Sequence, residues 1–184
     1  MMSDVYNLEC ELDHPANRVD FKSSRDRVVD YFVYRKGDGK FLSFVTLLAV
    51  AQEGHTHATL AETDYVEGSG GIPLFSERFV DNVGNAIDTD VKFHKCIVEC
   101  RGRNFQFLAG QTLQTRELVD VTRSSYHTLT DGSQILERAI YRTDISSDFL
   151  LARERTEPSR LLASKKLREL ALSSGLKIRF LPPI

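Results

Sequence analysis

Residues 161–183 read LLASKKLRELALSSGLKIRFLPP and decide the fold of this chain. Ser164 can cap a helix, because its hydroxyl can accept hydrogen bonds from the free N–H groups of a first helical turn. Leu167, Leu170 and Ala171 then recur at the i, i+3 and i+4 spacing that places side chains on one helical face. The pattern predicts a helix after Ser164 that turns this face to the core.

A strand is expected on each side of this helix. The apolar runs 149–152 and 161–163 precede it and are separated by charged and turn residues. Gly175 can take the left-handed conformation that commonly ends a helix. The apolar residues of the segment 176–180 then alternate with basic ones, as in a half-buried strand. The C-terminal forty residues therefore predict a strand–helix–strand unit that closes the fold.

The same unit recurs earlier in the chain. The apolar run 72–75 leads into Ser76, Phe79 and Val83 follow at the spacing of the later helical face, and a strand is expected from residue 91. Neither helix has an apolar face large enough to stand alone, so both must pack on a sheet. The predicted fold class is α+β, a mixed, mainly antiparallel sheet with two short serine-capped helices from this repeated strand–helix–strand unit.

The composition is that of a soluble globular protein. Hydrophobic residues make up 41% and charged residues 27% of the 184 positions, which suits one domain with a sizeable core. We expect a single domain, 1–184, in which residues 1–69 form a hairpin-like part. Residues 70–184 carry both strand–helix–strand units.

Two interpretations remain open near residue 25. Ser23 or Ser24 could cap a helix that carries the apolar residues after it. The segment 28–34, however, is dense in β-branched and aromatic residues, which favour strands. We favour a hairpin between this segment and residues 41–50.

Three cysteines, Cys10, Cys96 and Cys100, are an odd number without the paired spacing of a zinc site. On one strand Cys96 and Cys100 would lie about 13 Å apart, too far for a disulfide. The first residues lack the basic and apolar regions of a signal peptide, and the longest apolar run, 41–51, is too short to span a bilayer. The sequence therefore predicts a cytoplasmic protein with reduced thiols and no membrane partner.

His55 and His57 are the first residues that could carry chemistry. On a strand they would share one face, an arrangement that binds Zn²⁺ or Cu²⁺ when a third ligand is near. The candidate third ligands by residue type are Glu53, Asp64, His94 and His127. None of these is assigned by spacing, so we expect no metal and no cofactor. The simpler interpretation is two polar residues that enter a strand.

Signatures of catalysis and of nucleic-acid binding are missing from the sequence. Residues 124–127 offer Ser and His without a Gly-x-Ser-x-Gly elbow or an assigned acid. The glycine run 68–71 lacks the Gly-Lys-Ser/Thr ending of a phosphate loop. Basic patches with interleaved aromatic residues, which mark nucleic-acid binders, are missing too. We therefore expect a protein that is not an enzyme, with no catalytic residue and no nucleic-acid partner.

Three segments of the chain resemble a bacterial immunity-protein family, the eleventh in the catalogue of immunity families of polymorphic toxin systems. LLASKKL (161–167), ending in GLKIRFLP (175–182), resembles its C-terminal signature. LVDVTRS (118–124) resembles its hydrophobic–Asp–x–x–x–Ser segment, and LFSERF (74–79) its hydrophobic–Ser–Glu–x–hydrophobic segment. The resemblance covers roughly residues 70–184.

This resemblance implies a cytoplasmic protein that binds a cognate toxin domain and blocks it without catalysis. Two alternatives from other classes remain. One is a small metal-dependent enzyme or metal-binding protein that uses His55 and His57, and the other is a non-catalytic structural or scaffold domain. The resemblance does not name the toxin.

Charge is distributed unevenly along the chain. Residues 50–100 hold nine acids and three bases, a balance of −6, whereas residues 145–184 hold four acids and eight bases, a balance of +4. A toxin that attacks nucleic acid would need a basic cleft to attract phosphates, and carboxylates would complement such a cleft. The toxin-binding residues predicted on this ground, all expected to be exposed, are Glu62, Asp64, Glu67, Asp88 and Asp90.

Overall fold

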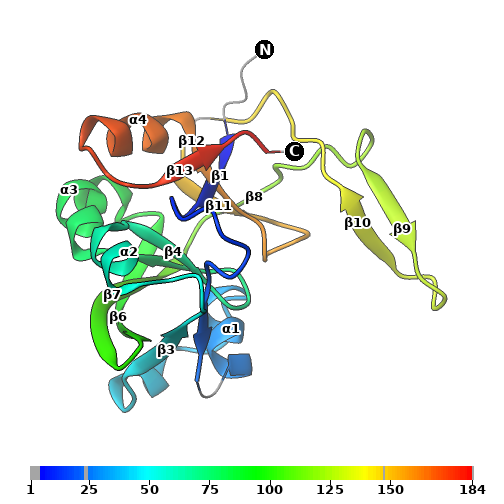
Figure 1. The fold of residues 1–184 in the computed structure, drawn as a ribbon. Coiled ribbons are helices and arrows are strands. Elements are labelled where there is room, and N and C mark those ends of the chain that lie inside the picture. The colour runs from blue at the N-terminus through cyan, green and yellow to red at the C-terminus, as the bar shows by residue number, and fades with distance from the viewer. Residues whose placement is uncertain (1–4, 23–24, 147, 184) are drawn as a thin grey trace.

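The computed structural model describes residues 5–22, 25–146 and 148–183. It is an α+β structure in which a closed barrel of six strands lies beside an open sheet of five strands (Figure 1). A separate two-stranded hairpin projects from this body (Figure 1). The α+β class with mixed, mainly antiparallel strand pairing is confirmed. The closed barrel was not predicted.

The barrel follows the order β2 (Val19–Phe21), β3 (Leu47–Ala51), β6 (Val91–Cys100), β7 (Arg103–Thr112), β5 (Ile72–Phe75) and β4 (Tyr65–Gly68). The pairs β3/β6 and β2/β4 are parallel, and the other neighbours are antiparallel. On β7, Phe105, Phe107 and Ala109 are buried in the barrel core, because alternate side chains of a strand point to the same face.

Helix α1 (Arg25–Phe32) contributes Val28, Tyr31 and Phe32 to this core. The hairpin expected here is therefore wrong. The β-branched and aromatic residues that favoured a strand are instead the buried face of a helix, which tertiary packing stabilises against local propensity. The partner segment forms a short 3₁₀-helix, Lys40–Ser43, before β3 begins. The proposed caps Ser23 and Ser24 lie outside the described residues.

The open sheet follows the order β13 (Arg179–Leu181), β1 (Val5–Glu9), β12 (Leu161–Ser164), β11 (Leu151–Glu154) and β8 (Thr115–Arg116). Its only parallel pair among the described strands is β8/β11. The N-terminal strand β1 pairs with both β12 and β13, so the first and last described strands of the chain are neighbours.

The two predicted strand–helix–strand units share one arrangement. Strands β5 and β6, on either side of α3 (Glu77–Ile87), both pair antiparallel with β7. Strands β12 and β13, on either side of α4 (Lys165–Ser173), both pair antiparallel with β1. The hydroxyl of Ser76 accepts from Phe79 N–H at 3.0 Å, and that of Ser164 accepts from Leu167 N–H at 3.3 Å.

Both helices turn their apolar faces into one core between the barrel and the open sheet. Phe79 and Val83 of α3 meet Leu167 and Ala171 of α4 in this cluster, and each is at most 1% exposed. The ring of Phe79 stacks on that of Phe75, with centroids 4.2 Å apart. The two units therefore support each other through a shared core.

The hairpin consists of β9 (Ser125–Thr128) and β10 (Gln134–Arg138), and α2 (His57–Glu62) lies between β3 and β4 in the chain. None of the helices in the described ranges is long and apolar enough to cross a membrane.

Leu167→Asp is expected to lower the free energy of unfolding by at least about 3 kcal/mol, because it places a charge at a position that is 0% exposed. Leu172→Asp on the same helix is the matched control. That position is 53% exposed, so its effect should stay within about 0.5 kcal/mol. Thermal melts followed by circular dichroism measure both. Equal melting temperatures for Leu167→Asp and the wild type would contradict the burial of this face.

Candidate functional site

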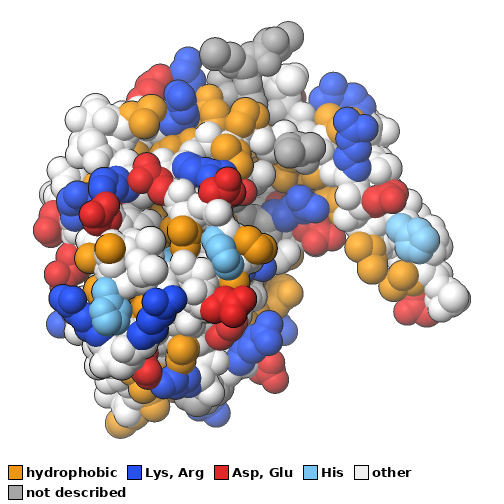
Figure 2. Space-filling model, viewed as in Figure 1, with side chains coloured by type: hydrophobic (Ala, Val, Ile, Leu, Met, Phe, Trp, Pro, Cys, Tyr) orange, Lys and Arg blue, Asp and Glu red, His pale blue; other side chains and the backbone are white. Residues whose placement is uncertain are grey.

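The hairpin, here called the arm (residues 121–139), is the feature that stands apart from the body. Figure 2 shows it reaching away from the barrel and the open sheet, with hydrophobic and histidine side chains along it. Within the described residues its strands β9 and β10 pair only with each other. A two-stranded hairpin is marginal by itself in water, so the arm needs local devices that hold its shape.

The tip of the arm is a tight turn at Asp131 and Gly132, an Asp-Gly pair of the kind that favours hairpin turns. Asp131 Oδ1 accepts from Ser133 N–H at 2.9 Å, and Gly132 has a φ of 84°, which favours glycine. Leu129 N–H donates to Ser133 C=O at 2.8 Å and closes the hairpin. The turn therefore sets the register of the two strands.

The root of the arm is held by Asp120 and Ser124. Ser124 Oγ donates to Asp120 C=O at 2.6 Å and accepts from Ile140 N–H at 2.9 Å, and Asp120 N–H donates to Ile140 C=O at 2.7 Å. These bonds join the chain that enters the arm to the chain that leaves it. The hydrophobic–Asp–x–x–x–Ser segment is thus the anchor of the arm.

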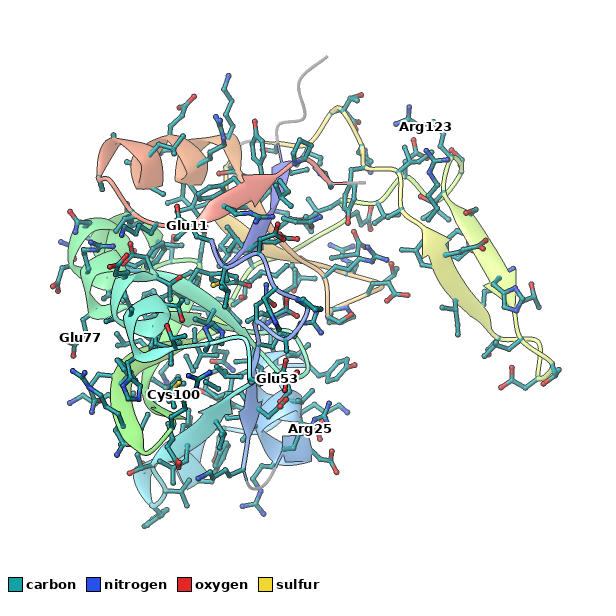
Figure 3. All side chains as sticks on the ribbon, in the orientation of Figure 1. Glu11, Arg25, Glu53, Glu77, Cys100 and Arg123 are labelled. Carbon is teal, nitrogen blue, oxygen red and sulfur yellow. The ribbon has the colours of Figure 1, made fainter. Side chains whose placement is uncertain are left out.

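The Asp120 carboxylate strengthens this anchor. It accepts from the Thr122 hydroxyl at 2.7 Å, from Arg123 Nε at 2.7 Å, and from the backbone N–H groups of both residues. These bonds, those from the Thr122 and Arg123 side chains first, lower the pKa of Asp120 to about 2. Figure 3 places Arg123 at the root of the arm.

The body side of the root is fastened by Glu154, a carboxylate that is 2% exposed. Its Oε2 accepts from the backbone N–H groups of Leu118 at 2.7 Å and Val119 at 2.8 Å. Leu136 and Tyr141 reach back from the arm side into the cluster on this face of the open sheet. The near end of the arm is therefore fixed to the body.

The arm leaves apolar side chains in solvent, one at its root (Val121) and two beyond it (Leu129 and Ile135). Val121 is 60%, Ile135 51% and Leu129 38% exposed. The arm contains two bases and two acids and so has no net charge with histidine neutral. Exposed apolar side chains on a neutral, projecting element suit a protein-binding surface.

The five acidic residues predicted to bind the toxin differ in how deeply they are buried. Asp64 was expected to be exposed, but it is 1% exposed. It accepts from the Ser76 hydroxyl, from Arg78 Nε at 3.0 Å, and from Lys177 N–H at 2.7 Å. Burial by itself would raise the pKa of Asp64, but these donors outweigh it and lower the pKa below its usual value.

Asp90 was also expected to be exposed and is 3% exposed. Its Oδ2 accepts from the backbone N–H groups of Leu150 at 2.5 Å and Leu151 at 3.2 Å. The exposure prediction is wrong for Asp64 and Asp90, because donors distant in the sequence, from side chains as well as the backbone, enclose the two carboxylates. A single sequence does not reveal such donors.

Glu62, Glu67 and Asp88, the other three predicted toxin-binding residues, do not form one acidic patch with Asp64 and Asp90. Glu62 is exposed and pairs with Lys177 at 2.9 Å. Half-buried Glu67 pairs with Arg18 at 3.3 Å, and burial raises its pKa. Exposed Asp88 follows α3 at its C-terminal end, whereas Asp64 contacts the N-terminal end. Eleven helical residues span about 16 Å, so the group is divided between separate places.

His55 and His57 do not share a strand face, because Thr56 is the N-cap of α2. Each imidazole Nε2 donates to a backbone carbonyl, His55 to Asn17 at 2.7 Å and His57 to Cys100 at 2.9 Å. The described residues contain no group of three His, Cys, Asp or Glu side chains placed to hold a metal ion. The strand interpretation of residues 55–57 is wrong, and both rings have structural partners.

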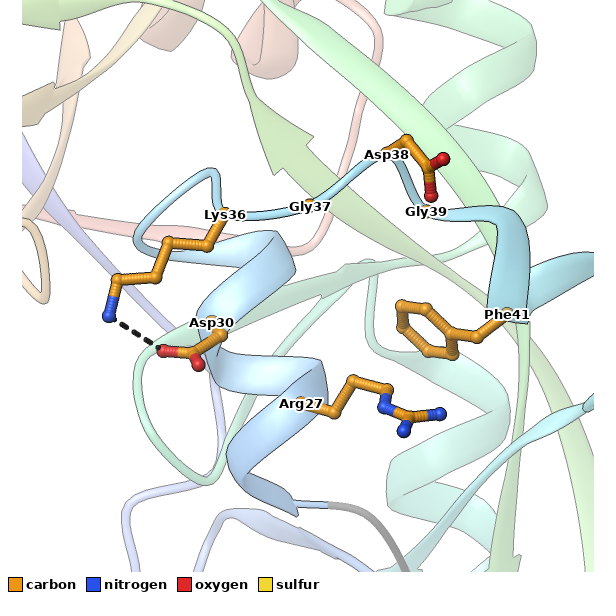
Figure 4. A pocket seen from close by; sticks show the side chains of 7 residues that line it. All are labelled: Arg27, Asp30, Lys36, Gly37, Asp38, Gly39 and Phe41. Atoms are coloured by element: carbon orange, nitrogen blue, oxygen red, sulfur yellow. Dashed lines mark hydrogen bonds and ion pairs between the residues drawn. The ribbon is translucent and has the colours of Figure 1, made fainter.

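Two hollows on the surface carry charged linings. One of about 610 Å³ lies at the root of the arm, where Arg142 pairs with Asp144 and Glu117. The other, of about 500 Å³, lies beside α1 (Figure 4). There Lys36 pairs with Asp30 at 3.3 Å, and the Arg27 guanidinium lies over the ring of Phe41.

No model of a known protein family matches the chain, and neither does any curated protein. The candidate site is therefore defined by its own geometry. It is an anchored arm with exposed apolar side chains, on a body in which Asp64, Asp90 and Glu154 hold backbone segments together. The sequence analysis named the Asp120–Ser124 segment but not its role as the anchor of the arm.

Asp64→Asn is expected to destabilise the protein at pH 7 by about 2 kcal/mol, because a carboxylate shared by three donors loses its charge. The pKa of folded Asp64 lies below that of the unfolded chain. Its contribution is therefore complete above about pH 4 and is lost as the pH falls through the folded value.

Thermal melts at pH 7 and pH 3 measure this dependence. The gap between the wild type and Asp64→Asn should narrow in acid. Asp88→Asn, at an exposed position, is the control and should change little at either pH. A gap of the same size at both pH values would contradict the stabilising role of the ionised carboxylate.

Ser124→Ala should loosen the root of the arm without unfolding the body. The change leaves Ile140 N–H without its side-chain acceptor, at a local cost of about 1–3 kcal/mol. Hydrogen exchange should become at least about tenfold faster at the amides of β9 and β10 and stay unchanged in β6 and β7. Ser133→Ala, which removes a hydroxyl at the tip, is the control. It should leave hydrogen exchange of the amides at the root unchanged. Unchanged exchange in Ser124→Ala would contradict the anchor.

Proposed function

We propose that this chain is an immunity protein that binds a cognate bacterial toxin domain and neutralises it by protein–protein contact. The observation that carries the proposal is the anchored arm, which exposes Val121, Leu129 and Ile135 on an element without net charge. Such a task needs a complementary surface and no catalytic group. About 800 Å² per partner, dominated by a few anchor side chains, is enough for a stable complex.

The resemblance to the immunity family supports this proposal through the roles its segments take. The segment 118–124 forms the anchor of the arm, and the segments 74–79 and 161–167 begin the two helices of the shared core. The motif residues therefore maintain the scaffold and the position of the arm. Toxin specificity would then reside in the arm's exposed side chains.

The arm replaces the acidic residues as the proposed toxin contact. Asp64 and Asp90 are buried, and Glu62 and Glu67 already have cationic partners. A neutral apolar arm fits a toxin surface that is recognised by shape and hydrophobic contact. The buried free thiols of Cys10, Cys96 and Cys100 suit the cytoplasm, where we place this encounter.

Ile135→Asp is expected to weaken the complex at least tenfold, or by about 1.4 kcal/mol, because it puts a charge into an apolar contact. The probe is the cognate toxin domain, to be sought at the end of a large reading frame next to the gene of this chain. Growth on co-expression reports protection, and calorimetry reports the Kd. Leu172→Asp is the matched control, since Leu172 is equally exposed but lies on α4.

The outcomes test two claims separately: that the chain is an immunity protein, and that the arm is its contact with the toxin domain. Loss of protection in Ile135→Asp with an unchanged melting temperature supports the arm as the contact. Full protection and an unchanged Kd in that variant would remove the arm from the mechanism. If the wild type neither protects nor binds, the immunity function itself is wrong and a scaffold role takes its place.

A further inference from the structure

The two strands of the arm differ in how they protect their outer edges. An exposed strand edge offers unpaired N–H and C=O groups to any passing strand, and proteins block such edges with charges, prolines or bulges. Strand β10 has two of these devices. Its register shifts between Leu136 and Arg138, and Glu137 and Arg138 are charged.

Strand β9 has none of these devices. Its sequence is Ser-Tyr-His-Thr, without Lys, Arg, Asp, Glu or Pro, and the extra residue of the bulge belongs to β10. Figure 1 shows β9 on the side of the arm turned away from the barrel and the open sheet. A strand from another molecule can therefore reach this edge without meeting the body.

The hydrogen-bond pattern identifies the free backbone groups on this edge. Leu129 N–H donates to Ser133 C=O, so these two residues form a hydrogen-bonded pair. Such pairs alternate with non-bonded pairs along an antiparallel ladder. His127 opposite Ile135 is then bonded, and Thr128 opposite Gln134 is not. The N–H and C=O groups of Tyr126 and Thr128 point outward from β9.

We propose that the toxin domain lays an exposed strand of its own along β9 and extends the arm into a three-stranded sheet. This inference rests on the proposed function and specifies how its partner is recognised. Main-chain hydrogen bonds to Tyr126 and Thr128 supply affinity, and the exposed side chains of Leu129 and Ile135 supply selectivity.

The charge of the arm selects the occupant. The arm has two bases and two acids, so its net charge is zero with histidine neutral. None of these four charged residues (Arg123, Asp131, Glu137 and Arg138) lies on β9. The complementary strand is therefore uncharged along its length, unlike the phosphate-binding cleft of a nuclease. A third strand also stabilises a hairpin that is marginal with two, so the amides of β9 gain protection from exchange when the toxin binds.

Thr128→Pro tests the edge directly. Proline removes the outward N–H but no bond to β10, and edge strands accept it where the N–H faces solvent. Thr128→Val is the matched control, because it loses the hydroxyl and keeps the N–H. With the toxin domain as the probe, Thr128→Pro should raise the Kd at least tenfold, and Thr128→Val should bind like the wild type.

A second pair of variants covers the case in which proline disturbs the hairpin itself. Thr128→Lys keeps the backbone donor but puts a charge into the new strand contact, whereas Gln134→Lys places the same charge directly opposite on β10. Hydrogen exchange of the free protein shows whether each variant keeps its arm. The proposal requires weaker toxin binding for Thr128→Lys than for Gln134→Lys.

The results distinguish this proposal from the function on which it rests. If Ile135→Asp loses binding but Thr128→Pro and Thr128→Lys bind as tightly as their controls, edge pairing is wrong and the immunity function stands. If the wild type binds no toxin domain, both fail. If light scattering finds a dimer of the free chain that Thr128→Pro abolishes and Thr128→Val keeps, the occupant of β9 is a second copy, and the toxin strand is overturned.

Discussion

The carboxylate of Asp64 is the contact on which the arrangement of the two strand–helix–strand units depends. It lies at the end of α2 and accepts from Ser76 and Arg78 at the start of α3 and from the backbone of Lys177 before β13. One buried group therefore joins the first unit to the second. Because an ionised carboxylate in the interior is costly without donors, this junction forms only when all three segments are in place.

Asp90 and Glu154 act in the same way elsewhere in the molecule. Each turns one carboxylate oxygen to two consecutive backbone N–H groups of a segment that is distant in sequence, Leu150 and Leu151 for Asp90 and Leu118 and Val119 for Glu154. These bonds satisfy donors that no strand pairing reaches. The acidic side chains thereby fasten the barrel, the open sheet and the arm root to one another.

The arm is the exception to this pattern of enclosure. The arm has few buried contacts beyond its root, where Asp120, Ser124 and Ile140 are hydrogen-bonded. The outer edge of β9 carries neither a charged side chain nor a bulge. Proteins commonly block such an edge with charges, prolines or bulges, and β9 has none of these. The enclosed body and the exposed arm are the observations on which the proposed role of the arm as a recognition element rests.

The sequence by itself determined the local features whose signals lie within a few residues. These are the apolar faces around Phe79 and Leu167, the turn at Asp131 and Gly132, and the mixed α+β class. Tertiary structure alone decided the closure of the barrel, the helical state of α1 and the burial of Asp64 and Asp90. Each of these depends on partners tens of residues away, such as the pairing of β3 with β6 or of Asp90 with Leu150. The arm depends on both the local sequence and the tertiary structure. The local sequence determines its turn, and packing around Glu154 and Leu136 determines which of its side chains stay exposed to solvent.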